Sequence, residues 1–106
     1  MGGVSVQTVI FGMLKEEKKR NLELQKTYIT EIESLRKGSI TVKNISGKNY
    51  YYLKYRQGGK VKNEYIGKDE SVAGEIKQEI EKRKYLQGVL KRLQLEYRQI
   101  SLIVKE

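Results

Sequence analysis

Apolar residues recur at helical spacing near the start of the chain. Between residues 13 and 37, four of them follow one another at intervals of four and three: Leu24, Tyr28, Ile32 and Leu35. This spacing places them on one face of a helix. It predicts a helix over residues 13–37 that ends at Gly38, after two cations in the last turn.

Residues 39–66 change to a period of two, in which apolar and polar positions alternate. Two turn sequences, Ser46-Gly47 and Gly58-Gly59, divide this stretch into three runs. The pattern predicts a three-stranded antiparallel meander. A two-residue turn at Ser46-Gly47 would set Val42 opposite Tyr51.

The register of the second hairpin depends on the length of its loop. A three-residue loop over 57–59 sets Tyr55 opposite Val61 and Tyr51 opposite Tyr65, so that one apolar set shares one face. A two-residue loop would instead turn two charged residues of the third strand toward that face. Because a slip of one residue inverts a strand, we predict the three-residue loop.

Residues 69–105 are predicted to form a second long helix, with Asp69 or Ser71 as its N-cap. Its apolar residues keep a heptad-like spacing over nearly three heptads: Leu86, Leu90, Leu93, Tyr97, Ile100 and Val104. Such a seam needs a helical partner, which is either residues 13–36 or, in a homodimer, another copy of the chain.

These elements predict an α+β fold in which a three-stranded antiparallel β-meander lies between two long helices that form an antiparallel hairpin or coiled coil. Residues 13–106 are expected to form a single domain. Met13 is an alternative start, so residues 1–12 are interpreted as an N-terminal extension that either lengthens the first helix or stays loose.

Composition argues against catalysis. The 106-residue chain has no Cys and no His, which removes thiol nucleophiles, the common general base and the common metal ligands. We therefore expect a binding protein with no enzymatic activity, cofactor or metal. The apolar stretch from Gly2 to Leu14 is too short to cross a bilayer and lacks the features of a signal peptide, so we expect a cytoplasmic protein with no membrane partner.

The net charge of +9 is concentrated in the predicted meander, where residues 38–68 hold seven Lys or Arg and one acid. The predicted register gathers most of these cations and two tyrosines on the face away from the helices: Lys43, Tyr50, Tyr52, Lys54, Arg56, Lys60 and Lys62. Lys and Arg neutralise phosphates, and tyrosine rings stack on bases. The face is therefore a candidate site for DNA or RNA.

Two other interpretations of this face stay open. Tyr and Lys are ordinary residues on an exposed strand, and Lys protects sheet edges from aggregation. The first interpretation is therefore that the face has only a structural role. In the second, the face binds an acidic protein partner, and the protein is a small interaction factor that inhibits a nucleic-acid-handling enzyme, for example as an anti-CRISPR protein. The run Gly58-Gly59-Lys60 lacks the context of a phosphate-binding loop and is interpreted as a turn.

Several segments carry a resemblance: Lys37-Gly38-Ser39-Ile40, Asn49–Arg56 (NYYYLKYR), Gly59–Lys62 (GKVK) and Tyr65–Lys68 (YIGK). With the preceding Met13–Glu17 (MLKEE) and Asn21–Lys26 (NLELQK), the chain resembles a group of small proteins, with no assigned activity, from Gram-positive bacteria and their mobile elements. The hairpin is also similar to strands of some transposases and of the arm-binding domains of phage integrases. The resemblance implies a phage or mobile-element context with DNA or RNA nearby.

Overall fold

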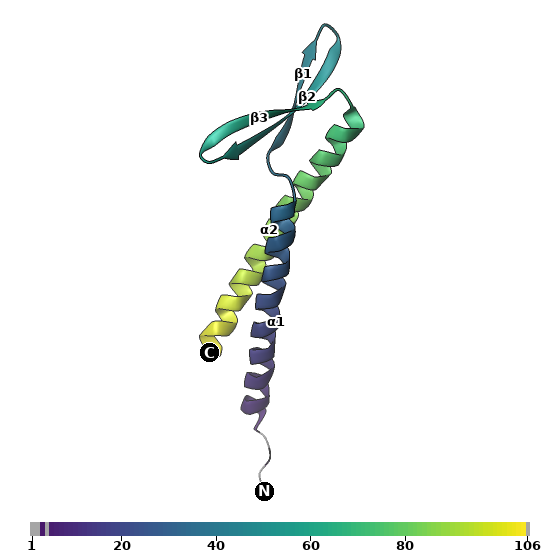
Figure 1. The fold of residues 1–106 in the computed structure, drawn as a ribbon. Coiled ribbons are helices and arrows are strands. Elements are labelled where there is room, and N and C mark those ends of the chain that lie inside the picture. The colour runs from purple at the N-terminus through teal and green to yellow at the C-terminus, as the bar shows by residue number, and fades with distance from the viewer. Residues whose placement is uncertain (1–2, 4, 106) are drawn as a thin grey trace. The chain divides into compact units, whose positions relative to one another are not determined.

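Two helices flank a three-stranded sheet in the computed structural model, which describes residues 3 and 5–105. Along the chain the elements are α1 (Val6–Ser34), β1 (Ser39–Ile45), β2 (Lys48–Gln57), β3 (Lys60–Gly67) and α2 (Glu70–Ile103) (Figure 1). The predicted α+β class with an antiparallel meander is confirmed. Parts of the predicted extension 1–12 and domain 13–106, namely residues 1, 2, 4 and 106, lie outside the described residues.

Helix α1 begins at Val6, several residues before the predicted start at residue 13. The Ser5 side chain caps it, because the Thr8 N–H donates to Ser5 Oγ at 3.2 Å and the Val9 N–H donates to the Ser5 carbonyl at 3.1 Å. The described part of the extension therefore lengthens the helix. A domain boundary at residue 13 stays a prediction.

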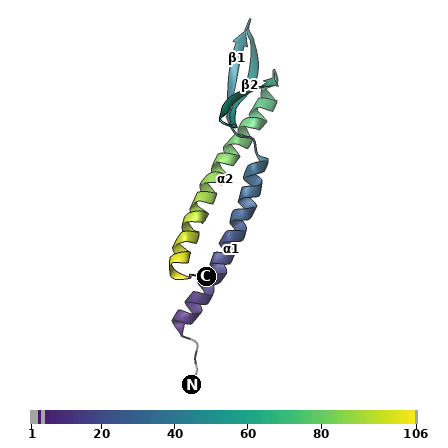
Figure 2. The same cartoon turned by 60° about the vertical axis from the view of Figure 1, so that its left-hand side comes forward.

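The chain divides into two compact units, a helical unit of Met1–Ile32 with Leu86–Glu106 and a sheet unit of Glu33–Tyr85. In the helical unit, α1 and α2 lie side by side and run in opposite directions (Figure 1 and Figure 2). Of the predicted seam, Leu86 and Val104 are buried and the four residues between them are half-buried. Pairing within the chain thus covers much of this seam, and a homodimer through it stays a prediction.

Two amide side chains are buried in the helical unit, at Asn21 and Gln25. Gln25 Nε2 donates to Asn21 Oδ1 at 2.7 Å, and Asn21 Nδ2 donates to the Leu93 carbonyl oxygen at 2.9 Å. The hydrogen bonds satisfy groups that would be costly to bury alone. The second of them also links α1 to α2, at Asn21 on one helix and Leu93 on the other.

The sheet unit has an aliphatic core in which Leu53 of β2 packs on Ile76 and Ile80 of α2. Leu53 is only 3% exposed. Three further residues from β1, β2 and β3 pack around this cluster: Ile40, Tyr55 and Ile66. The sheet thus buries one face on α2, as predicted.

The first hairpin has the predicted register, with Val42 opposite Tyr51 and Ile40 opposite Leu53. Its turn residues Ser46 and Gly47 have φ values of 56° and 80°. Positive φ at both positions is the signature of a type I′ turn, whose twist matches that of paired strands.

The predicted register of the second hairpin is wrong. Gly58 and Gly59 both have positive φ, 57° and 77°, so they form the same kind of two-residue turn. Gln57 is consequently opposite Lys60, and Arg56, not Tyr55, is opposite Val61. Turn geometry therefore prevailed over the apolar pattern that favoured a three-residue loop.

The second hairpin contains a bulge near the end of β3. The pairing shifts between Tyr51 and Tyr52, which are opposite Gly67 and Tyr65, so Ile66 is the extra residue. Ile66 packs on the core, whereas Tyr65 turns to the opposite face, where it is 52% exposed. Val61, also expected on the packed face, is 48% exposed on that same opposite face.

Local backbone chemistry determines how β1 and α2 begin. Gly38, which precedes β1, has a φ of +117°, and a Cβ there would overlap the Lys54 carbonyl oxygen, so only glycine fits.

At the start of α2, the Ser71 hydroxyl and N–H donate to Asp69 Oδ1 at 2.8 and 2.9 Å. These hydrogen bonds, that of the hydroxyl foremost, lower the pKa of Asp69 and confirm it as the N-cap.

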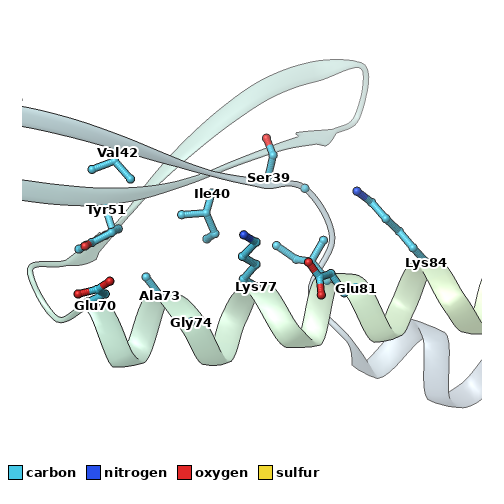
Figure 3. A pocket seen from close by; sticks show the side chains of 12 residues that line it. Ser39, Ile40, Val42, Tyr51, Glu70, Ala73, Gly74, Lys77, Glu81 and Lys84 are labelled. Carbon is cyan, nitrogen blue, oxygen red and sulfur yellow. The ribbon is translucent and has the colours of Figure 1, made fainter.

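A cleft of about 440 Å³ runs between β1 and the first half of α2. Figure 3 shows Val42, Ile40 and Tyr51 on the strand side, facing Ala73 and Gly74 on the helix. Charged side chains of both signs lie along the helical wall: Glu70, Lys77, Glu81 and Lys84. The sheet therefore does not close fully on α2 beneath β1.

Candidate nucleic-acid interface

The face of the sheet turned away from α2 is defined by the two registers. In the first hairpin it carries Lys43 opposite Tyr50 and Thr41 opposite Tyr52. In the second hairpin, Tyr52 is opposite Tyr65, and Arg56 is opposite Val61. Since side chains alternate along each strand, the remaining members share this parity: Ser39, Ile45, Lys48, Lys54 and Asn63. We call this set the tyrosine face.

Three tyrosines form the centre of the tyrosine face. The rings of Tyr52 and Tyr65 have centroids 5.3 Å apart and are tilted by 53°, and those of Tyr50 and Tyr65 are 6.4 Å apart and tilted by 40°. Tyr50 and Tyr52 are half-buried, and Tyr65 is exposed. The three rings thus form one aromatic surface, against which a planar ligand could stack.

Two lysines reach over this cluster. Lys43 Nζ lies 4.8 Å from the centre of the Tyr52 ring, and Lys68 Nζ lies 5.4 Å from that of Tyr50. The cation–π contacts place positive charge beside the aromatic surface. A base stacked on a ring would therefore have its phosphate near an ammonium group.

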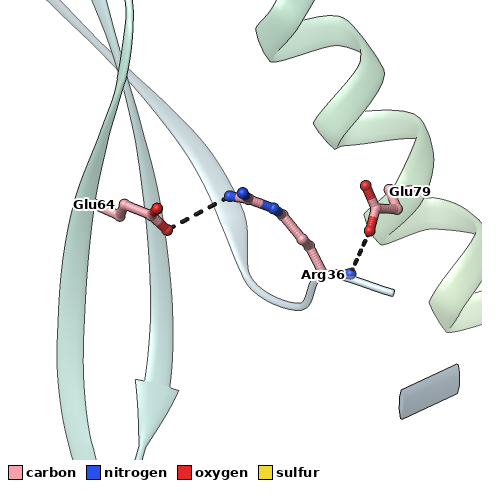
Figure 4. Close-up of polar contacts among 3 residues, drawn as sticks. All are labelled: Arg36, Glu64 and Glu79. Carbon is pink, nitrogen blue, oxygen red and sulfur yellow. Dashed lines mark hydrogen bonds and ion pairs between the residues drawn. The ribbon is translucent and has the colours of Figure 1, made fainter. Parts of the chain in front are cut away.

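The tyrosine face contains no Asp or Glu among its strand residues, all of which the structure describes. The acid of the meander, Glu64, is opposite Leu53 and so belongs to the other face. There Glu64 Oε2 lies 3.5 Å from the Arg36 guanidinium, and the Arg36 N–H donates to Glu79 Oε1 at 2.9 Å (Figure 4). The carboxylates thus stabilise the connection before β1 and leave the tyrosine face uniformly basic.

Five of the seven predicted site residues lie together on the tyrosine face: Lys43, Tyr50, Tyr52, Lys54 and Arg56. The predicted placement of Lys60 and Lys62 on this face is wrong. They are opposite Gln57 and Tyr55, on the face that carries Leu53, because the loop is one residue shorter than expected.

Sequence reasoning missed Tyr65, Lys48 and Lys68. Tyr65 was assigned to the packed face through the wrong register, although the Gly-Gly dipeptide is a strong signal for a two-residue turn. Lys68 follows β3, so strand parity gives no position for it.

Other kinds of site find little support in the described residues. No group of three or more His, Cys, Asp or Glu in that part of the chain could hold a metal ion. None of the described helices is long and apolar enough to cross a membrane.

Comparison with known proteins identifies a family for the chain. No curated protein and no solved structure matches the chain. A family model matches residues 14–78, which is more than half of the chain and includes the whole sheet and most of α1. The chain therefore belongs to the family described as a domain of unknown function, DUF6788.

Proposed function

We propose that the protein binds nucleic acid, without catalysis, through the tyrosine face. The observation that carries the proposal is a cluster of three tyrosines in ring contact, with a lysine over each of two rings and no acid among the strand residues of that face. A phosphate backbone needs the cations, and unpaired bases or sugars need the ring surfaces. The proposal includes a cytoplasmic location and the mobile-element context that the hairpin motif implies.

The spacing of the cations fits a phosphate chain. Adjacent strands lie about 4.8 Å apart, and residues of one face recur about every 6.7 Å along a strand. Lys43, Lys54 and Arg56 lie on two adjacent strands within a few such steps, and Lys68 extends the patch over Tyr50. The patch is thus comparable in size to a few successive phosphates.

The test is a titration of labelled single-stranded DNA, duplex DNA and RNA, read by fluorescence anisotropy at about 50 and 200 mM salt. We expect binding at low salt that weakens steeply at high salt. The double reversal Lys54→Glu/Arg56→Glu should weaken binding by about 100-fold or more, because both side chains are exposed on the tyrosine face. Circular dichroism should show an intact fold.

The matched control is Lys60→Glu/Lys62→Glu, which makes the same change in charge a few residues away on the other face. We expect this variant to bind within about threefold of wild type. Equal losses in both variants would mean that net charge alone, and not the tyrosine face, governs binding. No binding by the wild type at low salt would overturn the proposal and favour an acidic protein partner instead.

A further inference from the structure

The two free edges of the sheet differ in how well they are protected against pairing with another strand. The strand order is β1-β2-β3, so β1 and β3 are both edges, and no other described strand pairs with either. Strand β3 carries Lys60, Lys62 and Glu64 and a bulge against β2, which are devices that discourage edge pairing. Strand β1, with the sequence SITVKNI, has one charge, no bulge and no proline.

The less protected edge, that of β1, lies beside the cleft beneath this strand. Val42 in the middle of β1 is 53% exposed and lines this cleft, opposite the small residues Ala73 and Gly74 of α2 (Figure 3). A Cβ built on Gly74 would have no neighbour within 4 Å. An added strand would therefore find both backbone groups to pair with and room for apolar side chains.

We propose that β1 pairs with β1 of a second copy of this chain, in antiparallel orientation, to form a continuous six-stranded sheet. The strand is self-complementary when the two-fold axis passes through Thr41. Ile40 of each copy then lies opposite Val42 of the other, with both side chains on the cleft side.

Charge excludes one alternative register. Centred on Thr41, the pairing sets Lys43 opposite Ser39 of the other copy, so the charged residue of β1 meets a small neutral side chain. A register centred on Lys43 would place two ammonium groups directly opposite each other, which is destabilising. The chain has a net charge of +9, so a contact between copies requires a segment that avoids like charges.

Pairing within the plane of the sheet leaves the two tyrosine faces on the same side of the dimer, since a two-fold axis perpendicular to a sheet preserves its faces. Where the proposed function holds, one nucleic-acid strand could contact both copies, with a gain in affinity from the linked sites. The dimer itself does not depend on that function, and its tests use protein freed of nucleic acid.

The first test is the molar mass in solution, measured by light scattering and by sedimentation over a range of micromolar concentrations. We expect a dimer at the upper end of the range. Val42→Lys should raise the dissociation constant of the dimer at least about tenfold, because it places a charge against Ile40 of the other copy. Its matched control is Val61→Lys on β3, a valine with a similar exposed fraction on the other edge, which should leave the mass unchanged.

A second variant separates a blocked cleft from a damaged fold. Gly74→Glu should increase the helix propensity of α2 and fill the cleft, so the protein should become monomeric while its melting temperature rises. Gly88→Glu makes the same change at another open helical glycine, outside the cleft, and should raise the melting temperature without affecting the dimer.

The register is tested by cross-linking, for which the absence of cysteine in the chain is an advantage. Thr41→Cys should form a disulfide-linked dimer on mild oxidation, because each residue would face its own symmetry mate. Asn63→Cys on β3 is the control and should stay monomeric. A monomeric mass at every concentration, or a dimer that survives both Val42→Lys and Gly74→Glu, would overturn the proposal.

Discussion

In the sheet unit the buried side chains are aliphatic or alanine, whereas in the helical unit two of the buried side chains are amides. Leu53, Ile76 and Ile80 form a core that is stabilised by removal of apolar surface from water. Asn21 and Gln25 instead lie between two helices and are held by hydrogen bonds to each other and to a backbone carbonyl. The comparison shows that one short chain uses burial to hold a sheet on a helix and polar pairing to align two helices.

The physical difference lies in specificity. Apolar contacts are non-directional, so an aliphatic seam tolerates sliding of one helix along the other. The buried hydrogen bond from Asn21 to the Leu93 carbonyl is directional, so it favours the observed alignment over one that leaves the amide unpaired. In the sheet unit, alignment comes from the strand registers, so the core has no need of a polar group.

The largest effect is expected from truncation of the aliphatic core. Leu53→Ala should lower the free energy of unfolding by about 2–5 kcal/mol, because it removes a buried side chain and leaves a cavity against α2. Urea denaturation measures this loss. Tyr50→Ala, on the tyrosine face, should cost less. A greater loss for Tyr50→Ala would mean that the two faces of the sheet are exchanged.

The polar pair should respond in a way that an aliphatic core would not. Asn21→Ala should cost about 1–3 kcal/mol, because it leaves the buried Gln25 amide without its partner. The double variant Asn21→Leu/Gln25→Leu should be close to neutral or stabilising, since no polar group is then left unpaired.

Urea denaturation of the single and double variants measures the coupling between the two amides. If Asn21→Leu/Gln25→Leu lost as much stability as the sum of the two single leucine variants, the amides would act as independent packing groups. The contrast between the two units would then be one of composition only.

The smallest effect is expected at the start of α2, where Asp69 caps the helix in the sheet unit. Since its pKa is lowered in the folded protein, its stabilising contribution is present above the pKa of the unfolded chain and is lost as the pH falls through the folded value. Asp69→Ala should lower the melting temperature by a few degrees at neutral pH and by less in acid.

Asp69→Asn is the control, because asparagine also caps helices but does not titrate in this range. The difference in melting temperature between Asp69→Asn and Asp69→Ala should not change with pH. A constant difference between wild type and Asp69→Ala from neutral to acidic pH would contradict the capping role of the carboxylate.

Much of the fold was predictable because its signals are local. Apolar spacing located both helices, the alternation and the turn dipeptides located three strands, and Asp69 was among the two expected caps. The helix start at residue 13 was less accurate, since residues 1–12 have no charged side chain and no clear period, whereas Ser5 is a good cap that only the observed hydrogen bonds identify.

The candidate site was predictable where parity followed from one well-defined turn. Lys43, Tyr50 and Tyr52 share a face through the first hairpin, whose register was expected correctly. Lys60 and Lys62 were misplaced, and Tyr65 was missed, because the apolar pattern favoured a three-residue loop, whereas the two-residue Gly58-Gly59 turn sets the alternation of β3.

Hydrophobic periodicity and turn chemistry along the chain are thus sufficient for the elements and their order, because each depends on neighbours in sequence. Other features depend on contacts between distant residues: Ile66 packs on the α2 core beside a bulge, and Glu64 has Arg36 beside it. The burial of Asn21 likewise depends on a carbonyl on the other helix. Such choices are decided by tertiary structure, because the partners that make them favourable are brought together only when the chain folds.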